Sequence, residues 1–374
     1  MKLPHENVDP DGLQEFSVVF TDRSLNHMSQ RFQLVMRDIS GLLREAYHGQ
    51  AVALVPGGGT YAMEAVARAF GRGQVVVVRN GWFSYRWSQI FDAGGFASGV
   101  TVVMARQTGN GAQAPYAPPP IAEVVARIRE VRPEAVFAPH VETSSGIILP
   151  DDYVRAMAAA AHEVGALLVL DCIASGCVWV DMAETGVDVL ISAPQKGWSA
   201  APAVGLVVLS AAAEARLEGV VPDSFALDLK KWRGIMAAYE GGGHGYHATM
   251  PTDAIVTLRD AMLETKAMGF AAAKAAQWEL GGAVRAVLAG LGAGSVAAEG
   301  FAAPGVVVSY TNDPEVQNGA KFRALGYQIA AGVPLQVGEG AEFRTFRLGL
   351  FGLDKLADVA ATVERLRVAL DRVL

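Results

Sequence analysis

Several features that assign a protein to a particular class are scarce in this chain of 374 residues. It has two cysteines, Cys172 and Cys177, which make no disulfide framework, so we expect a reducing, cytoplasmic setting. No apolar run reaches the roughly 20 residues that a membrane helix needs. The polar N-terminus, MKLPHENVDPDG, lacks the apolar segment of a signal peptide. A secreted, disulfide-rich or membrane protein is therefore not expected.

Basic clusters and metal-binding motifs are equally scarce. The formal charge is −7 and no block of basic residues is present, which disfavours nucleic acid or an anionic membrane as a partner. His244 and His247 lie close together, but no cysteine or further histidine is near them in sequence. A zinc site needs more ligands than these two, so we expect no metal.

Glycine and short apolar runs are abundant instead. The 41 glycines and the hydrophobic content of 51% are typical of an α/β enzyme with many tight turns. Three runs, 167–170, 187–191 and 204–209, each adjoin polar residues, and their length and composition predict strands buried on both faces. Ligands of open α/β sheets bind beyond the strand ends. Asp171 and Lys196 follow the first two runs, so we expect both of them near a ligand.

The remaining pattern predicts a large domain, a small one and an N-terminal arm. Strands are expected at 51–55, 74–79, 100–104 and 135–139, with helices at 28–43, 121–132 and 151–165, and this alternation favours a mainly parallel sheet. The Gly-rich stretch 222–255 is interpreted as irregular. From 267 the expected elements are a helix at 267–290, strands at 306–310 and 343–348, and a closing helix at 356–373. The predicted units are an arm (1–20), a large domain (21–266) and a small α/β domain (267–374).

Asp171 and Lys196 together suggest pyridoxal 5′-phosphate (PLP). A lysine in a dry pocket loses its proton readily and can form a Schiff base with an aldehyde, and an acid can keep the pyridine nitrogen protonated. The segments DCIAS and SAPQKGWSAAPAVG resemble the core of the class V aminotransferases of PLP fold type I. The resemblance implies a mainly parallel seven-stranded sheet between helices. It also implies that Lys196 carries the cofactor and moves the substrate proton. The alternative is that Asp171 only marks a strand end and that Lys196 is an ordinary surface lysine.

The turn after the 51–55 strand suits an anion. Glycines at the start of a helix let the backbone approach an anion, and the helix N-terminus supplies free N–H groups and a favourable dipole. Gly58, Gly59 and Thr60 would hold the cofactor phosphate, unless the turn is only structural. GGGTYAMEA resembles the phosphate turn of the class V enzymes, which supports the first interpretation.

The resemblance assigns further roles. In NGWFSYRW the residue that stacks on the cofactor ring is Phe83, with Trp82 as the alternative. In HVETSSG, Thr143 is expected to contact the ring or its phenolic oxygen, whereas Ser144 and Ser145 are interpreted as caps of the turn and His140 as structural. Ile173 and Gln195 complete the expected cofactor-binding residues of this subunit. Thr21-Asp22-Arg23 stands where many relatives have a Pro-Gly-Pro turn, which leaves the substrate open.

Two segments extend the expected site. GYHATMP resembles a family segment that reaches the neighbouring subunit, so Tyr246 and Thr249 would contact the partner's phosphate in a homodimer. In TFRLGLFG, Arg347 matches the arginine that binds the substrate α-carboxylate, and Arg344 is the competing candidate.

The expected reaction moves an amino group from alanine or serine to a 2-oxo acid such as glyoxylate or pyruvate. YHATMP and FRLGLFG favour this assignment, whereas GGGTYAMEA and ETSSG fit a 2-aminoethylphosphonate–pyruvate aminotransferase equally well. Another class V enzyme, of the lyase or desulfurase type, is a further alternative. A desulfurase needs a thiol on a mobile loop, but both cysteines follow the strand that ends at Asp171, which disfavours it.

Overall fold

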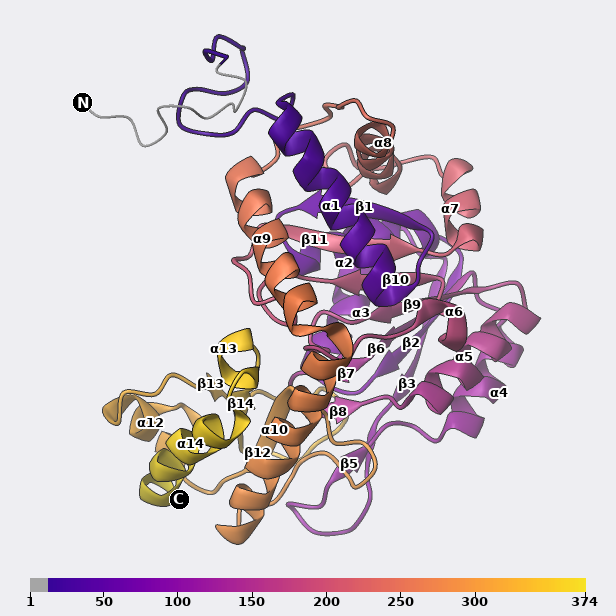
Figure 1. The fold of residues 1–374 in the computed structure, drawn as a ribbon. Coiled ribbons are helices and arrows are strands. Elements are labelled where there is room, and N and C mark those ends of the chain that lie inside the picture. The colour runs from indigo at the N-terminus through magenta and orange to yellow at the C-terminus, as the bar shows by residue number, and fades with distance from the viewer. Residues whose placement is uncertain (1–12) are drawn as a thin grey trace.

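The computed structural model describes residues 13–374, and its centre is a seven-stranded sheet with helices packed around it (Figure 1). The prediction of a mainly parallel seven-stranded sheet is confirmed. Of the expected arm at 1–20, residues 1–12 lie outside the described residues, and 13–20 contain no helix or strand. In order across the sheet, the strands are β1 (Ala51–Pro56), β11 (Val204–Leu209), β10 (Val189–Ser192), β9 (Leu167–Asp171), β6 (Ala135–Pro139), β2 (Gln74–Arg79) and β3 (Gly99–Met104).

One strand of this sheet, β11, runs against its two neighbours. It pairs antiparallel with both β1 and β10, whereas the pairs β10–β9, β9–β6, β6–β2 and β2–β3 are all parallel. The connection from β10 to β11, residues 193–203, contains no helix. A parallel return needs a crossover of a dozen or more residues, usually helical, so this connection reverses the strand direction.

The helices of the large part pack apolar faces onto the sheet. In α1, residues at helical spacing are buried, among them Phe32, Val35, Met36 and Ile39. The helices expected near 28–43, 121–132 and 151–165 are present with shifted ends. They and their neighbours are α1 (Gln30–Tyr47), α2 (Gly59–Phe70), α3 (Trp82–Gly94), α4 (Ile121–Val131), α5 (Asp151–Glu163), α6 (Met182–Thr185) and α7 (Ala211–Glu218).

The interpretation of 222–255 as irregular is wrong. It contains α8 (Leu229–Glu240) and the start of α9 (Thr252–Met268). Asp228 caps α8 by accepting a hydrogen bond from the Lys231 backbone N–H at 3.0 Å. The buried residues of α8 recur at helical spacing, but the glycines that follow at 241–243 hide this pattern in the sequence.

The C-terminal part packs a second sheet against two long helices. The helix expected at 267–290 is α10 (Phe270–Gly290), separated from α9 by Gly269 with φ 90°. The three strands lie in the order β12 (Val306–Tyr310), β14 (Thr345–Gly349), β13 (Ala330–Ala331). The expected closing helix is divided into α13 (Leu353–Leu356) and α14 (Val359–Val373), and two short helices, α11 (Pro314–Gln317) and α12 (Ala320–Ala324), lie between β12 and β13. The domain boundary at 266 and 267 stays a prediction.

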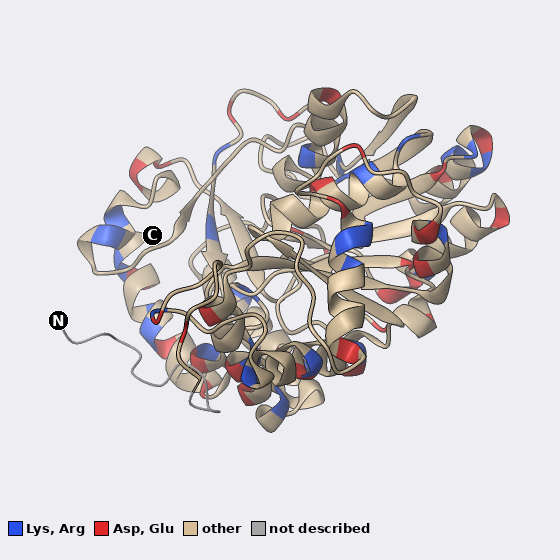
Figure 2. Ribbon diagram, turned by 90° about the horizontal axis from the view of Figure 1, so that it is seen from above, with Lys and Arg blue, Asp and Glu red and all other residues tan. Residues whose placement is uncertain are grey.

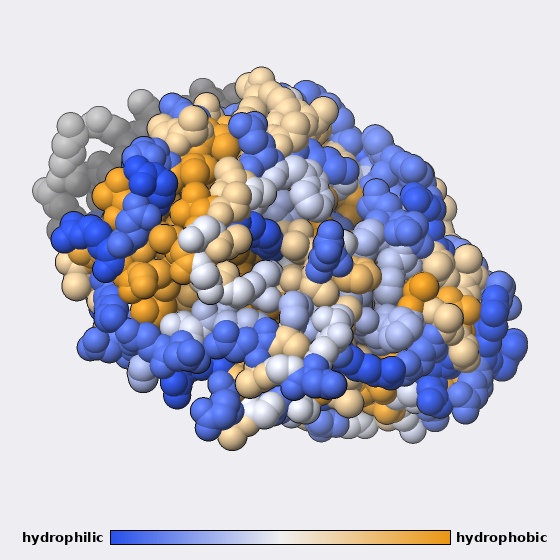
Figure 3. Space-filling view, turned by 90° about the horizontal axis from the view of Figure 1, so that it is seen from below, coloured by the Kyte–Doolittle hydropathy of each residue, from blue (hydrophilic) through white to orange (hydrophobic). Residues whose placement is uncertain are grey.

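The surface mixes charges of both signs and keeps some apolar area. Figure 2 shows Lys and Arg interspersed with Asp and Glu on the helices. From below, apolar residues gather toward one side of the molecule (Figure 3). Trp278 of α10 and Val368 of α14 are among the exposed large apolar side chains. These two helices therefore leave part of their apolar surface in contact with solvent.

Two short hairpins complete the described chain, β4 (Arg106–Gln107) with β5 (Tyr116–Ala117), and β7 (Val141–Glu142) with β8 (Ile147–Ile148). The second hairpin encloses the Thr-Ser-Ser-Gly turn and places it beside the start of α3. None of the helices within 13–374 is long and apolar enough to cross a membrane. No group of three His, Cys, Asp or Glu side chains in the same residues is arranged to hold a metal ion.

Candidate active site

Asp171 and Lys196 lie at the same edge of the sheet. Asp171 ends β9 and is paired with Ile191 of the neighbouring parallel strand β10, after which the chain turns to Lys196. The Asp171 side chain is buried, and its Oδ1 accepts a hydrogen bond from the Ile173 backbone N–H at 2.9 Å. Lys196 is half-buried, with its Nζ 5.3 Å from the centroid of the Phe351 ring. The two charges are close enough to influence each other's pKa, but they form no direct ion pair.

Burial shifts both groups toward their neutral forms. It raises the pKa of Asp171 to about 6, against the opposing effects of the Ile173 hydrogen bond and of the Lys196 charge. Burial also lowers the pKa of Lys196, and the charge of Arg347 lowers it further, whereas Asp171 raises it. A lysine with a depressed pKa is a better nucleophile and base near neutral pH. A positively charged ligand atom at Asp171 would restore its ionised form.

The backbone next to Lys196 is held by a close approach of two chain segments. A Cβ atom on Gly197 would lie 2.2 Å from the Gly176 carbonyl oxygen, so only glycine fits there. The Cys177 thiol donates to the Gly197 carbonyl oxygen at 3.5 Å. On the other side of the turn, the Ser199 hydroxyl accepts a hydrogen bond from the Leu353 backbone N–H at 2.9 Å. The loop after β9 and the start of α13 thus fix the turn that carries Lys196.

The start of α2 offers unpaired backbone donors. The N–H groups of Gly58, Gly59 and Thr60 make no hydrogen bond to any residue within 13–374. Gly58 has φ 114°, and a Cβ on it would meet nothing within 4 Å, so one side of the turn is open. A Cβ on Gly59 would lie 2.5 Å from the Ile173 side chain, which places Ile173 between the turn and Asp171. Free N–H groups at the positive end of a helix suit an anion.

Glu142 is a buried carboxylate that the sequence analysis did not select. It accepts hydrogen bonds from the backbone N–H groups of Phe83 at 3.1 Å and Ser84 at 2.8 Å, and from the Ser84 hydroxyl at 2.6 Å. It also accepts from the backbone N–H and the hydroxyl of Ser144. Glu142 therefore caps α3 from outside the helix and fixes the position of Phe83. The signal in the sequence was an acid in a stretch that is otherwise buried.

The other members of HVETSSG divide into structural residues and one open candidate. The Ser145 hydroxyl donates to the Asn80 carbonyl oxygen at 3.0 Å, and Ser144 accepts from the Trp82 backbone N–H at 2.8 Å, so both serines join this turn to the α3 loop. His140 contacts Ser175 at 2.7 Å, and burial lowers its pKa to about 3, which makes it a neutral core residue. Thr143 is half-buried and makes no hydrogen bond within 13–374, so its hydroxyl is available to a ligand.

Two arginines lie near the Phe83 ring. The Arg347 guanidinium carbon is 5.5 Å from the ring centroid, and the Arg86 carbon is 5.3 Å from it. Arg347 donates from Nε to the Ala331 carbonyl oxygen at 2.8 Å, whereas Arg344 donates to the Asn312 carbonyl oxygen at 3.1 Å. Of the two arginines predicted to bind the substrate carboxylate, Arg347 and Arg344, only Arg347 influences the pKa of Lys196. The structure thus brings Phe83, and not Trp82, together with Arg347, and it adds Arg86, which the sequence analysis missed.

The roles expected for the remaining positions stay predictions. Gln195 immediately precedes Lys196 and is exposed. Tyr246 is 54% exposed, its hydroxyl lies 3.2 Å from that of Thr249, and its ring contacts His27 at 5.3 Å between centroids. No contact within 13–374 joins Tyr246 or Thr249 to Asp171 or Lys196. The segment 21–23 precedes α1, where the Thr21 carbonyl oxygen accepts from the Ser24 N–H at 3.2 Å.

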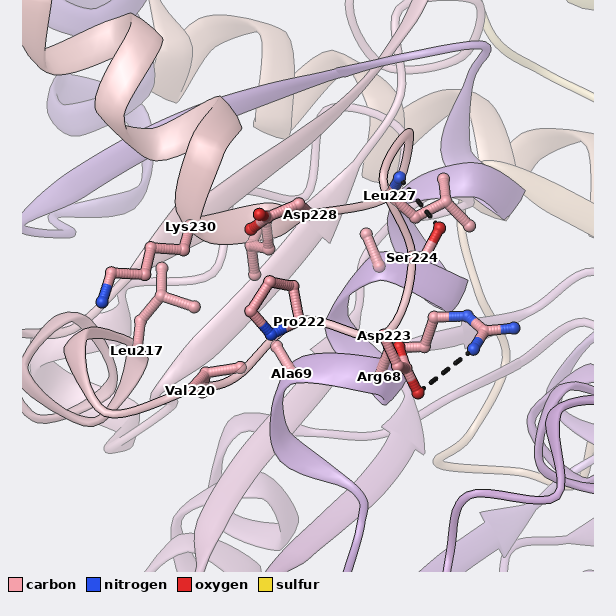
Figure 4. A pocket seen from close by; sticks show the side chains of 12 residues that line it. Arg68, Ala69, Leu217, Val220, Pro222, Asp223, Ser224, Leu227, Asp228 and Lys230 are labelled. Atoms are coloured by element: carbon pink, nitrogen blue, oxygen red, sulfur yellow. Dashed lines mark hydrogen bonds and ion pairs between the residues drawn. The ribbon is translucent and has the colours of Figure 1, made fainter. Parts of the chain in front are cut away.

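Two depressions elsewhere differ from this site. One lies at the far end of α2, where the Arg68 guanidinium is 3.3 Å from Asp223 (Figure 4). Its volume of about 10 Å³ is room for about one water molecule. The other, of about 340 Å³, lies beside β14 and is lined by Thr345, Glu339 and neighbouring loop residues. Neither of them is lined by Asp171 or Lys196.

Comparison with known proteins decides the family. The model of the class-V aminotransferase family matches residues 13–299. This chain belongs to the class-V aminotransferases. It is 28% identical over 350 residues to a 2-aminoethylphosphonate–pyruvate transaminase of Burkholderia ambifaria, covering 91% of this chain and 87% of the relative. It is also 28% identical over 342 residues to a Synechococcus protein named as the small subunit of a soluble hydrogenase, covering 90% and 85%.

Solved structures show that this class-V aminotransferase has fold type I. An alanine–glyoxylate aminotransferase from Nostoc superposes with a TM-score of 0.77 at 23% identity, covering 93% of this chain and 88% of the other. An aspartate aminotransferase from Thermus thermophilus superposes with a TM-score of 0.75 at 25% identity, covering 94% of each chain. The family implies PLP as cofactor. The open turn at Gly58, its three unpaired N–H groups and the facing Asp171 and Lys196 fit that group.

Proposed function

We propose that Lys196, Asp171 and the turn at 58–60 hold PLP, whose ring withdraws electrons from a bound amino acid and so acidifies its α-proton. The observation that carries the proposal is the placement of Asp171 at the end of β9 and of Lys196 in the turn after the adjacent parallel strand β10, where their charges influence each other without a direct ion pair. A flat ring between the two side chains would contact both of them.

Each of these residues has a separate task. Lys196 carries the cofactor, and its freed amine takes the proton from the substrate α-carbon and delivers it again, which its lowered pKa favours. The Asp171 carboxylate holds a proton on the ring nitrogen. Phe83 packs on the ring, and the Thr143 hydroxyl is a donor for the phenolic oxygen. Arg347 binds the substrate carboxylate through its parallel N–H groups.

The proposed reaction transfers the amino group of alanine or serine to glyoxylate or pyruvate. Arg347 supports a substrate with an α-carboxylate, because its guanidinium lies beside Phe83 and influences Lys196. A second candidate is transfer from 2-aminoethylphosphonate to pyruvate, which relatives such as the Burkholderia ambifaria protein favour by their names. The amino donor of the second reaction lacks a carboxylate but offers a phosphonate, which a guanidinium also binds.

We also propose a homodimer with shared active sites. Tyr246 and Thr249 present their hydroxyl groups together, with Tyr246 largely exposed, and they touch neither Asp171 nor Lys196 of their own chain. Apolar side chains at Leu13, Phe16 and Val18 are exposed as well. This pattern fits a surface that a second subunit covers, with the hydroxyl pair reaching the phosphate in the partner.

The test is an absorbance spectrum combined with an amino-transfer assay. Wild-type protein should show a visible Schiff-base band, and Lys196→Ala should lose both the band and the activity. Lys321→Ala is the control, because it removes an exposed lysine that is paired with Asp313. A Lys196→Ala protein that keeps the band and the turnover contradicts the proposal. Assays of alanine, serine and 2-aminoethylphosphonate against glyoxylate and pyruvate then separate the two candidate reactions.

A further inference from the structure

Arg86 is a cation beside the predicted phosphate turn, and no carboxylate within the described residues is paired with it. It is the fifth residue of α3, and its Nη1 donates to the Thr60 hydroxyl oxygen at 3.0 Å. No ion pair joins it to an acidic side chain within 13–374. Its charge lowers the pKa of both Asp171 and Lys196, so the guanidinium lies within electrostatic range of the candidate site.

This arrangement brings two positive features together. Thr60 belongs to the turn whose three N–H groups are unpaired, at the positive end of the 12-residue helix α2. A guanidinium next to a helix N-terminus is repelled by the helix dipole unless an anion lies between them. The repulsion between the guanidinium and the helix N-terminus costs free energy in the cofactor-free protein. It is replaced by two attractions when a doubly charged anion binds between them.

The two arginines near Phe83 are anchored at different places. Arg347, on β14, is held by the Ala331 carbonyl oxygen, whereas Arg86 is held by the Thr60 hydroxyl at the start of α2. An anion that contacts the N–H groups of 58–60 is therefore within reach of Arg86. A substrate carboxylate bound by Arg347 would therefore use a different guanidinium from the one that this anion reaches.

We propose that Arg86 is a further cofactor-binding residue, which contacts the phosphate group of PLP together with the Gly58–Thr60 turn. The inference rests on the proposed function and deepens it, because it assigns the charge that balances the phosphate. It predicts that Arg86 contributes to the affinity for phosphorylated ligands and contributes little to that for their unphosphorylated forms.

The experiment measures ligand affinity rather than turnover. Cofactor-free wild type, Arg86→Gln and Arg86→Lys are titrated with PLP and with pyridoxal, which has the same ring and aldehyde without the phosphate. Loss of a charge-assisted contact should weaken PLP binding by about 10- to 100-fold in Arg86→Gln, less in Arg86→Lys, and leave pyridoxal affinity unchanged. Arg129→Gln, which removes an exposed arginine paired with Glu163, is the charge-matched control and should change neither affinity. Inorganic phosphate should compete with PLP less well in Arg86→Gln than in wild type.

Three results would overturn the inference. If PLP and pyridoxal affinities fall together in Arg86→Gln, the residue only supports the shape of the site. If both affinities are unchanged and only the KM of an amino donor or acceptor rises, Arg86 binds substrate. If wild-type protein binds neither aldehyde, the proposed function fails first and this inference fails with it.

Discussion

Glu142 accepts two hydrogen bonds from Ser84, one from its backbone N–H at 2.8 Å and one from its hydroxyl at 2.6 Å. Ser84 follows Phe83, so the carboxylate and the stacking candidate are fixed to each other through the first turn of α3. A Cβ on Gly81 would lie 2.1 Å from the Ser144 hydroxyl oxygen, which requires glycine in the Asn-Gly pair that precedes Phe83. The loops after β2 and β6 are therefore joined into one wall of the candidate site.

Removing the Glu142 carboxylate should destabilise this wall. Glu142→Ala leaves several buried donors without an acceptor, and we expect the free energy of unfolding to fall by about 3 kcal/mol. Glu142→Gln keeps the shape of the side chain and one acceptor oxygen, so its free energy of unfolding should fall by less. Urea unfolding measures both, with Glu163→Ala as the control, because that ion pair is exposed and contributes little to stability. A Glu142→Ala protein as stable as this control would show that the hydrogen bonds at α3 contribute little.

Asp171 should make the stability of the cofactor-free protein depend on pH. Burial raises its pKa from 3.8 to about 6, so the folded protein keeps a proton that the unfolded chain has already lost. The stabilising contribution is complete below pH ~4 and is lost as the pH rises through ~6, which amounts to about 3 kcal/mol. Asp171→Asn has no such titration. Its free energy of unfolding should therefore rise by about 3 kcal/mol relative to wild type between pH ~4 and pH ~7. If the free energies of unfolding of wild type and Asp171→Asn change with pH in the same way, the pKa of Asp171 is not raised.

The contact between Gly197 and Gly176 can be tested by adding one methyl group. Gly197→Ala places a carbon 2.2 Å from the Gly176 carbonyl oxygen, and we expect it to lower the free energy of unfolding by about 2 kcal/mol and to reduce cofactor uptake at Lys196. Gly234→Ala is the matched control. Gly234 lies inside α8, and a Cβ there would meet nothing within 4 Å, so alanine should stabilise the helix by about 0.5 to 1 kcal/mol. Equal free energies of unfolding for the two variants would contradict the close approach of Gly197 to the Gly176 carbonyl oxygen.

The sheet could be predicted from the sequence because its strands are short, apolar and separated by helices. Six of its strands run parallel, and the alternation of strand and helix signals gives that direction. The reversal at β11 was not predicted, because the direction depends on whether residues 193–203 form a crossover. Helix α8 was missed because the glycines after it outweighed the spacing of Leu229, Trp232 and Met236 in the interpretation.

The site shows a similar division. Asp171 ends a strand, and Lys196 and the 58–60 turn each follow one, so their position at one sheet edge follows from the sequence pattern. Glu142 and Arg86 could not be assigned in this way, because their importance comes from partners distant in sequence, Ser84 for one and Thr60 for the other. Arg347 lies within β14, whereas Arg344 precedes the strand and donates to the Asn312 carbonyl oxygen. The sequence alone could not say which of the two turns toward Lys196.

Shared active sites can be tested by mixing two inactive subunits. Lys196→Ala has lost the amine but keeps Tyr246 and Thr249, which are the groups proposed to reach the partner. A second variant, Tyr246→Ala with Thr249→Ala, keeps Lys196 but should bind the cofactor too weakly for activity. In a hybrid dimer, the subunit that keeps Lys196 receives intact Tyr246 and Thr249 from its partner, which completes one of the two sites.

Random exchange of the two variants should therefore restore about a quarter of the wild-type activity. The hydroxyl pair is 3.2 Å apart and has no contact to Lys196 of its own chain, which is why complementation between subunits is expected. If each site used only residues of its own chain, every site in the mixture would stay defective, because one variant lacks the amine and the other the hydroxyl groups. Activity of the mixture that does not exceed the sum of the separate variants would thus refute the shared site. Size-exclusion chromatography of the mixture checks that hybrid dimers have formed.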